Sequence, residues 1–136
     1  MILLDSNICI AILHSVPAVV NRLSKVEDVV AIPGMVEGEL FYGVEKSLRK
    51  DDNLRACEEF LQNTPVVYPD HAIMFKFGEL KARLERQGNR VDDADIMIAA
   101  TAICNKSILA TGNVRHFERF DELEIQNWFA TDQPEV

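Results

Sequence analysis

Carboxylates next to predicted secondary-structure boundaries are the side chains in this sequence that most suggest chemistry. Asp5 directly follows the apolar run 2–4, which is typical of a short buried strand. Asp95 lies in the first turn of a predicted helix, 93–105, that is apolar around most of its circumference and is therefore expected to be buried. A buried carboxylate is costly without a partner. For Asp95 alone, the simpler alternative is a first-turn acid that the helix dipole stabilises.

A third acid comes from the segment 34–48, which is predicted to be helical despite its glycines. Glu37 falls within the arc of the apolar stripe of this helix, and Glu39 falls at its edge. Helical periodicity therefore does not choose between them, and either one can belong to an ordinary solvated face.

Further polar residues lie close to these acids in the predicted arrangement. Asp92 lies one turn before Asp95, on nearly the same side of the helix. It can act as the helix cap or as part of a site. Asn113 follows a predicted strand, where an Asn after a Gly is also ordinary turn chemistry. Three basic residues follow shortly afterwards: Arg115, His116 and Arg119. They can form a local contact to phosphate, or they can belong to a solvated charged face.

If Asp5, Asp95 and one Glu converge, their like charges need a cation or a shared proton. Hard oxygen ligands suit Mg²⁺ or Mn²⁺, and the chemistry that follows is metal-assisted phosphodiester hydrolysis. The chain has 14 Lys and Arg against 22 Asp and Glu, so its net charge is 14 − 22 = −8. So acidic a chain does not attract nucleic acid through its overall field. A bridging cation or a local basic patch is therefore expected.

Strands and helices alternate along the chain, which predicts a parallel sheet with helices on both faces. Strands are predicted at 2–4, 28–33, 66–69, 107–111 and 124–127. Helices are predicted at 8–13, 17–25, 34–48, from Asp51 or Asp52 to 62, from Asp70 to 87, and from Asp92 or Asp93 to 105, with Ser6 or Asn7 as the cap of the first.

The 136 residues suit one domain, predicted over 1–130, with a short polar tail at 131–136. Cys9, Cys57 and Cys104 are too widely spaced for a disulfide framework or a metal motif and are expected to be free thiols. No apolar run reaches the ~18 residues that span a bilayer, and the start of the chain is unlike a signal peptide. A cytoplasmic protein without a membrane partner is expected.

Four blocks together resemble the PIN domain, specifically the VapC-type toxin ribonucleases of toxin–antitoxin pairs. They are residues 2–7 (ILLDSN), 38–43 (GELFYG), 92–100 (DDADIMIAA) and 109–117 (LATGNVRHF), followed by Asn127-Trp128. Each block is short, but together they run in the family's order over nearly the whole chain.

The resemblance implies a three-layer α/β/α sandwich with a central parallel sheet and a Mg²⁺ or Mn²⁺ site. It assigns Asp5, Glu39 and Asp95 as the metal-binding catalytic acids, and so selects Glu39 over Glu37. Ser6 matches a hydroxyl residue near the site. Asn113 stands where many members have a fourth acid, which leaves open whether one or two metal ions bind.

The resemblance also implies endonucleolytic cleavage of structured RNA, often tRNA, a cognate VapB-type antitoxin that blocks the site, and a homodimer. Asp92 and Arg115 are additional candidate residues near the site or the substrate. Two alternatives stay open: a catalytically weak PIN domain that binds RNA or protein, and a phosphatase with Asp5 as nucleophile. The second would want an acid two residues later, where this chain has Asn7.

Overall fold

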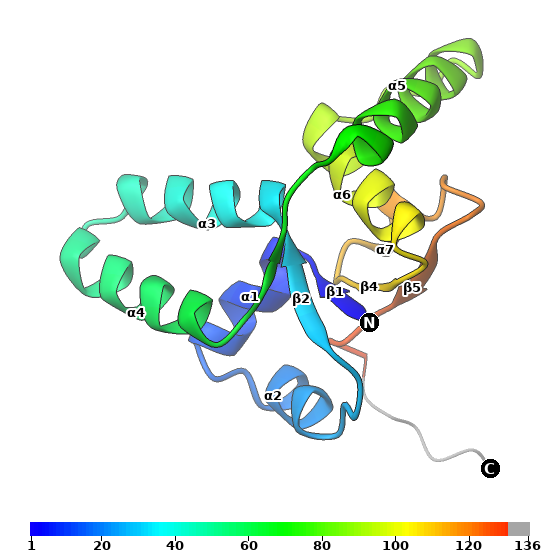
Figure 1. Ribbon diagram of the computed structural model, residues 1–136. Helices are drawn as coiled ribbons and strands as arrows, with labels where there is room; N and C mark the ends of the chain where they lie inside the picture. The colour runs from blue at the N-terminus through cyan, green and yellow to red at the C-terminus, as the bar shows by residue number, and fades with distance from the viewer. Residues whose placement is uncertain (131–136) are drawn as a thin grey trace.

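The computed structural model describes residues 1–130, and the predicted polar tail at 131–136 lies outside the described residues. Five strands are present: β1 (Ile2–Leu4), β2 (Val30–Pro33), β3 (Val66–Val67), β4 (Ile108–Ala110) and β5 (Glu124–Gln126). The helices are α1 (Ser6–Leu13), α2 (Pro17–Ser24), α3 (Gly34–Lys46), α4 (Lys50–Gln62), α5 (His71–Arg86), α6 (Asp93–Cys104) and α7 (Val114–Phe117). Figure 1 shows the strands side by side with helices around them.

The five strands form one all-parallel sheet in the order β3-β2-β1-β4-β5. The chain therefore steps outwards from β1 to β3 and then crosses back over β1 to β4 and β5. Because crossovers between parallel strands are right-handed, this reversal places helices on both faces of the sheet. The predicted α/β/α architecture is confirmed. The reversal between β1 and β4 is the position where sites form in open α/β sheets.

Several helix boundaries follow from local chemistry. Asp70 caps α5, because its carboxylate accepts a hydrogen bond from the backbone N–H of Ile73 at 2.9 Å. Gly88 follows this helix with φ +74°, a conformation that glycine adopts without strain.

Two predicted caps are wrong. Asp5, rather than Ser6 or Asn7, caps α1 and accepts from the backbone N–H of Ser6. Helix α4 begins at Lys50 after Arg49, so Asp51 and Asp52 lie inside its first turn, where the helix dipole favours acids.

The core includes residues of the central strands β1 and β4 and of helices α1, α3, α5 and α6. Helix α6 is buried from Ile96 to Ala102, as its all-round apolar sequence predicts. Trp128 is fully buried after β5. Cys9 and Cys57 are buried and Cys104 is partly buried, and all three are free thiols as expected.

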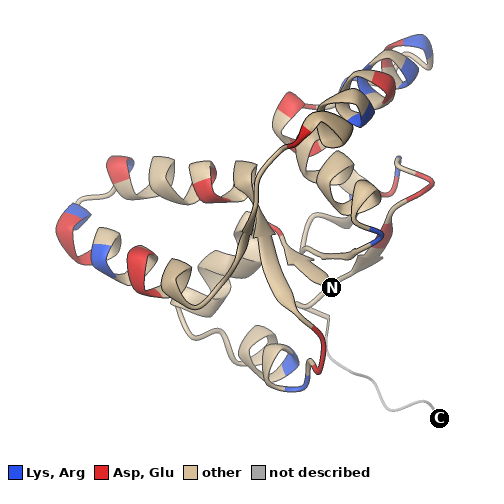
Figure 2. Cartoon of the chain, viewed as in Figure 1, with Lys and Arg blue, Asp and Glu red and all other residues tan. Residues whose placement is uncertain are grey.

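Helices α3 and α4 run side by side as a hairpin, and α5 projects from the sheet over α6 (Figure 1). Acidic and basic positions alternate along α4 and α5 (Figure 2). Between residues 1 and 130, no single helix is long and apolar enough to cross a membrane; α1 and α2 meet that test only as a pair bent by 101°, by length and composition alone.

Candidate active site

Asp5 lies at the centre of the candidate site. It directly follows β1, at the point where the strand order of the sheet reverses. Its backbone N–H continues the ladder to the carbonyl of Ala110 in β4 at 2.9 Å. Its carboxylate accepts hydrogen bonds from the N–H of Ser6 at 2.8 Å and from the hydroxyl of Thr111 at 2.7 Å. Strand geometry, helix capping and a neighbouring strand therefore all fix the same side chain.

Asp5 is buried, with 3 % of the residue exposed. Burial raises its pKa above the ordinary value, and the negative charge of Asp95 adds to this effect. The hydrogen bonds from Thr111 and Ser6 act in the opposite direction because they stabilise the ionised form. Asp5 is thus an acid whose ionised form is costly unless positive charge is supplied.

Glu39 and Glu37, which periodicity left undecided, lie in different environments on α3. One carboxylate oxygen of Glu39, Oε1, is buried and has no hydrogen-bond partner. Burial, followed by the charges of Asp5 and Asp95, raises the pKa of Glu39 to about 7, while the Ser6 hydroxyl lowers it. Glu37 instead accepts hydrogen bonds from the exposed Tyr68 hydroxyl at 3.0 and 3.1 Å. The structure therefore brings Glu39, and not Glu37, into the electrostatic field of Asp5.

Asp95 extends this cluster from the first turn of α6. Its charge raises the pKa of both Asp5 and Glu39. Its Oδ2 lies 3.3 Å from Nδ1 of His116 in α7. Sequence reasoning placed His116 in a possible phosphate contact and did not anticipate its pairing with Asp95. The pairing depends on α7, a four-residue helix that the sequence pattern did not predict.

A small network after β4 supports Asp5, and sequence reasoning missed most of it. Thr111 is fully buried, donates to Asp5, and accepts the backbone N–H of Asn113 at 2.9 Å. Asn7 accepts the N–H of Gly112 at 3.1 Å. A Cβ on Gly112 would lie 2.7 Å from the ring of Phe129, so this position accommodates only glycine without movement of that ring. The signal that was available is the position of Thr111 at the end of the predicted strand 107–111.

The remaining candidates lie at the rim of the site. Ser6 begins α1 and contacts the carboxylates through its backbone and side chain. Asp92 is exposed and is the N-cap of α6 without a side-chain capping bond. Asn113 and Arg115 are also exposed, beside and within α7. Ser6 thus contacts two of the three acids, whereas the side chains of Asp92, Asn113 and Arg115 are exposed around them.

The three central acids offer an all-oxygen donor set. The unpartnered Oε1 of Glu39 and the mutual repulsion of the three carboxylates are what a cation would relieve. Among residues 1–130, no three His, Cys, Asp or Glu side chains already converge closely enough to hold a metal ion. The residue types and their environment fit a hard divalent cation.

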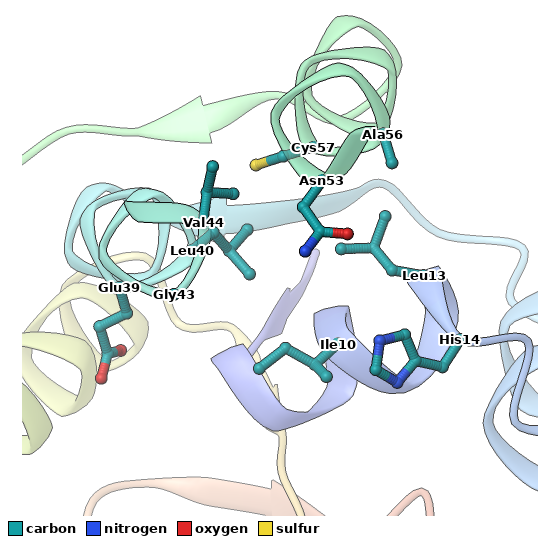
Figure 3. Close-up of a pocket in the computed structure, with 10 residues that line it drawn as sticks. All are labelled: Ile10, Leu13, His14, Glu39, Leu40, Gly43, Val44, Asn53, Ala56 and Cys57. Atoms are coloured by element: carbon teal, nitrogen blue, oxygen red, sulfur yellow. The ribbon is translucent and has the colours of Figure 1, made fainter. Parts of the chain in front are cut away.

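Two cavities border the cluster. One, of about 240 Å³, lies between α1, α3 and α4 and is lined largely by apolar side chains such as Ile10, Leu13 and Leu40. Figure 3 shows Glu39 at its edge, with the carboxylate directed away from the other lining residues. The other, of about 150 Å³, is lined by charged residues that include Asp95 and His116. Glu39 therefore borders the apolar cavity, and Asp95 borders the charged one.

Comparison with known proteins gives a consistent result. The family model described as the PIN domain matches residues 2–123. "Ribonuclease VapC2" of Rickettsia felis is 33% identical over 129 residues, covering 93% of this chain and 96% of that protein. "tRNA(fMet)-specific endonuclease VapC" of Shigella flexneri is 36% identical over 127 residues, with the same two coverages of 93% and 96%.

Among solved structures, VapBC2 from Rickettsia felis, bound to a DNA fragment from its promoter, superposes with a TM-score of 0.88 at 32% identity, covering 94% of this chain and 99% of that one. VapBC-1 from nontypeable Haemophilus influenzae gives a TM-score of 0.87 at 29% identity, with coverages of 96% and 100%. This chain belongs to the PIN-domain family, among its VapC ribonucleases. PIN-domain ribonucleases are generally dependent on divalent metal ions.

Proposed function

We propose that this chain is a Mg²⁺- or Mn²⁺-dependent endoribonuclease and the toxin of a VapBC-type toxin–antitoxin pair, acting in the cytoplasm on tRNA or another structured RNA. The single observation that supports this most strongly is the cluster of buried Asp5 with the partly buried Glu39 and Asp95, at the point where the strand order of the sheet reverses. The names of the ribonuclease relatives agree with this chemistry.

In this proposal Asp5, Glu39 and Asp95 hold the cation. When bound, a divalent ion offsets their charge, activates water and stabilises the charge that develops on a phosphodiester. The protein's own contribution is positioning: Thr111 and the N–H of Ser6 fix the orientation of Asp5. His116 restrains Asp95 from the other side of the cluster. Asn113, an amide at an exposed position, is proposed to contact substrate or a second ion weakly.

The experiment is cleavage of bulk tRNA by the purified chain with Mg²⁺, with Mn²⁺ and with chelator. Asp5→Asn and Asp95→Asn should each lower the cleavage rate by about 100-fold or more, because each removes a charged ligand. Asp51→Asn, a change at an exposed first-turn acid of α4, is the matched control and should leave the rate unchanged. Undiminished cleavage by both site variants would reject the metal-site assignment.

The partner is proposed to be a VapB-type antitoxin, since the solved relatives are described as VapBC complexes. The apolar cavity between α1, α3 and α4 supports this, because it opens beside Glu39 and its lining residue Ile10 is 46% exposed. Ile10→Asp should weaken inhibition by the product of the neighbouring reading frame without changing uninhibited cleavage. Equal inhibition of both proteins would contradict this placement.

We also propose a homodimer. Large apolar side chains remain exposed at the end of β3 and on α5, namely Tyr68, Met74 and Phe75. The molar mass in solution, measured by light scattering for the wild type and for Phe75→Glu, tests this; a monomeric wild type would contradict it.

A further inference from the structure

We propose that the cavity beside Asp95 is a phosphate-binding subsite, which holds a backbone phosphate of the RNA next to the phosphate that is cleaved. This inference rests on the proposed ribonuclease function. The cavity has a volume of about 150 Å³ and is formed by the loop before α6, the start of α6 and the region of α7. Its lining residues are Arg90, Val91, Asp92, Asp95, His116 and Arg119.

The side chain of Arg119 and the backbone of Arg90 are held together by a hydrogen bond. Arg119 donates from Nη1 to the backbone carbonyl of Arg90 at 3.1 Å, which ties the α7 region to the loop before α6. Phe117 and Phe120 are buried, with ring centroids 6.3 Å apart, and anchor the same turn in the core. His116 in α7 and Arg119 in the turn that follows α7 both line the cavity.

The two arginines share their cavity with the acidic residues Asp92 and Asp95 but, in the described part of the chain, form no ion pair with them. Lys81 and Arg83, in contrast, pair with Asp93 and Glu122. Within residues 1–130, Arg90 and Arg119 have no carboxylate at ion-pair distance. In a chain of net charge −8, these two arginines place positive charge directly beside an acidic site. Local cations of this kind are what an acidic protein needs to hold a nucleic-acid backbone.

The size and position of the cavity indicate what it binds. At about 150 Å³ it is smaller than the ~300–1,000 Å³ typical of pockets that enclose a whole organic ligand, and it suits a single phosphate group. Arginine presents a planar donor fork that matches phosphate oxygens. Asp92 and Asp95 line the same cavity. Asp95 also belongs to the carboxylate cluster, so a phosphate held by the arginines would lie directly beside that cluster.

The test uses the full chain with bulk tRNA as the probe. Cleavage kinetics are measured with Mg²⁺, and binding is measured by fluorescence anisotropy with Ca²⁺ in place of Mg²⁺ across a series of KCl concentrations. The variants are Arg90→Gln, Arg119→Gln, their combination, and Arg119→Lys. Arg55→Gln, at an exposed position of α4, is the control.

Each single Gln variant should raise KM about 3- to 10-fold with kcat unchanged, since it removes a charged contact to the substrate backbone. The slope of log K against log[KCl] should become shallower by roughly 0.7 per lost phosphate contact, and by about twice that in the double variant. Arg119→Lys should restore the salt slope because it keeps the charge. Arg55→Gln should match the wild type. Thermal unfolding of each variant checks that the fold is retained.

An active wild type with unchanged KM and salt slope in the double variant would overturn the subsite and leave the ribonuclease function standing. A fall in kcat at constant KM would also overturn it, because the arginines would then act on the reaction rather than on binding. Loss of the salt effect in Arg119→Lys would contradict the charge argument. A wild type that neither binds nor cleaves tRNA would reject the ribonuclease function for this substrate and the subsite together.

Discussion

Replacing Glu39 with glutamine is expected to stabilise the metal-free protein at alkaline pH and to leave it nearly unchanged in acid. The folded structure raises the pKa of Glu39 from its ordinary 4.5 to about 7 through burial and the charges of Asp5 and Asp95. The folded state therefore binds the proton more tightly than the unfolded state does. The cost of ionising Glu39 is absent below about pH 4.5, grows as the pH rises, and is complete above about pH 7.

The size of the effect follows from the same values. A pKa of about 7 in place of 4.5 corresponds to roughly 3 kcal/mol when the side chain is ionised in both states. Since Glu39 is only partly buried, solvent screening reduces this, and we expect about 1–2 kcal/mol. For a chain of this length, that is a rise in Tm of about 3–8 °C.

The assay is thermal unfolding of the wild type and of Glu39→Gln in chelator, at about pH 5 and about pH 8. Glu37→Gln is the matched control on the same helix, because Glu37 contacts the exposed Tyr68 hydroxyl and should change the free energy of unfolding by less than about 0.5 kcal/mol. The difference between variant and wild type removes the general effect of net charge on stability. If the stability gained by Glu39→Gln is no larger at the higher pH than at the lower one, burial and the neighbouring charges do not raise the pKa of Glu39.

Three further substitutions test the surrounding structure. Thr111→Val should lower the free energy of unfolding in urea by about 1–3 kcal/mol, because it removes the 2.7 Å hydrogen bond to buried Asp5. Thr111→Ser should retain most of the stability. Equal losses in the two variants would contradict a role for the hydroxyl. Gly112→Ala should lower the free energy of unfolding by about 1 kcal/mol, because its Cβ would lie 2.7 Å from the Phe129 ring. This loss should be smaller when Phe129 is also replaced by Ala. An unchanged loss would indicate that the backbone, and not the ring, opposes the substitution. Asp70→Ala should lower the free energy of unfolding by about 1 kcal/mol, because it removes the cap of α5. The rate of tRNA cleavage per folded molecule should stay unchanged. A lower specific activity would show that α5 affects the site.

Much of the fold could be predicted because its signals are local. Within residues 1–130, alternating apolar runs and helical segments identified the five strands and six of the seven helices. Strand order was not available locally, because the placement of β4 beside β1 depends on pairing across more than a hundred residues. The missing helix, α7, has four residues and no periodic pattern, so it forms as part of the packing of Phe117.

The candidate site shows the same division. Asp5 was identified from its place after a strand, and Asp95 from its place in a buried helix. The choice between Glu37 and Glu39 depended on family resemblance, because it is made by tertiary contacts: Tyr68 binds Glu37, while Glu39 lies near Ser6. Helical periodicity carries no information on such partners. The assignment of the three acids as metal ligands stays a prediction.

That assignment is tested most directly by the binding of Mn²⁺ to the purified protein, measured by electron paramagnetic resonance with Mg²⁺ as competitor. This measurement does not depend on knowing the RNA substrate. We predict Mn²⁺ binding that Mg²⁺ displaces in the wild type and in Glu37→Gln, and loss of that binding in Asp5→Asn and Glu39→Gln. Mn²⁺ binding that is unchanged in both of the latter variants would contradict the proposal that these carboxylates form the metal site.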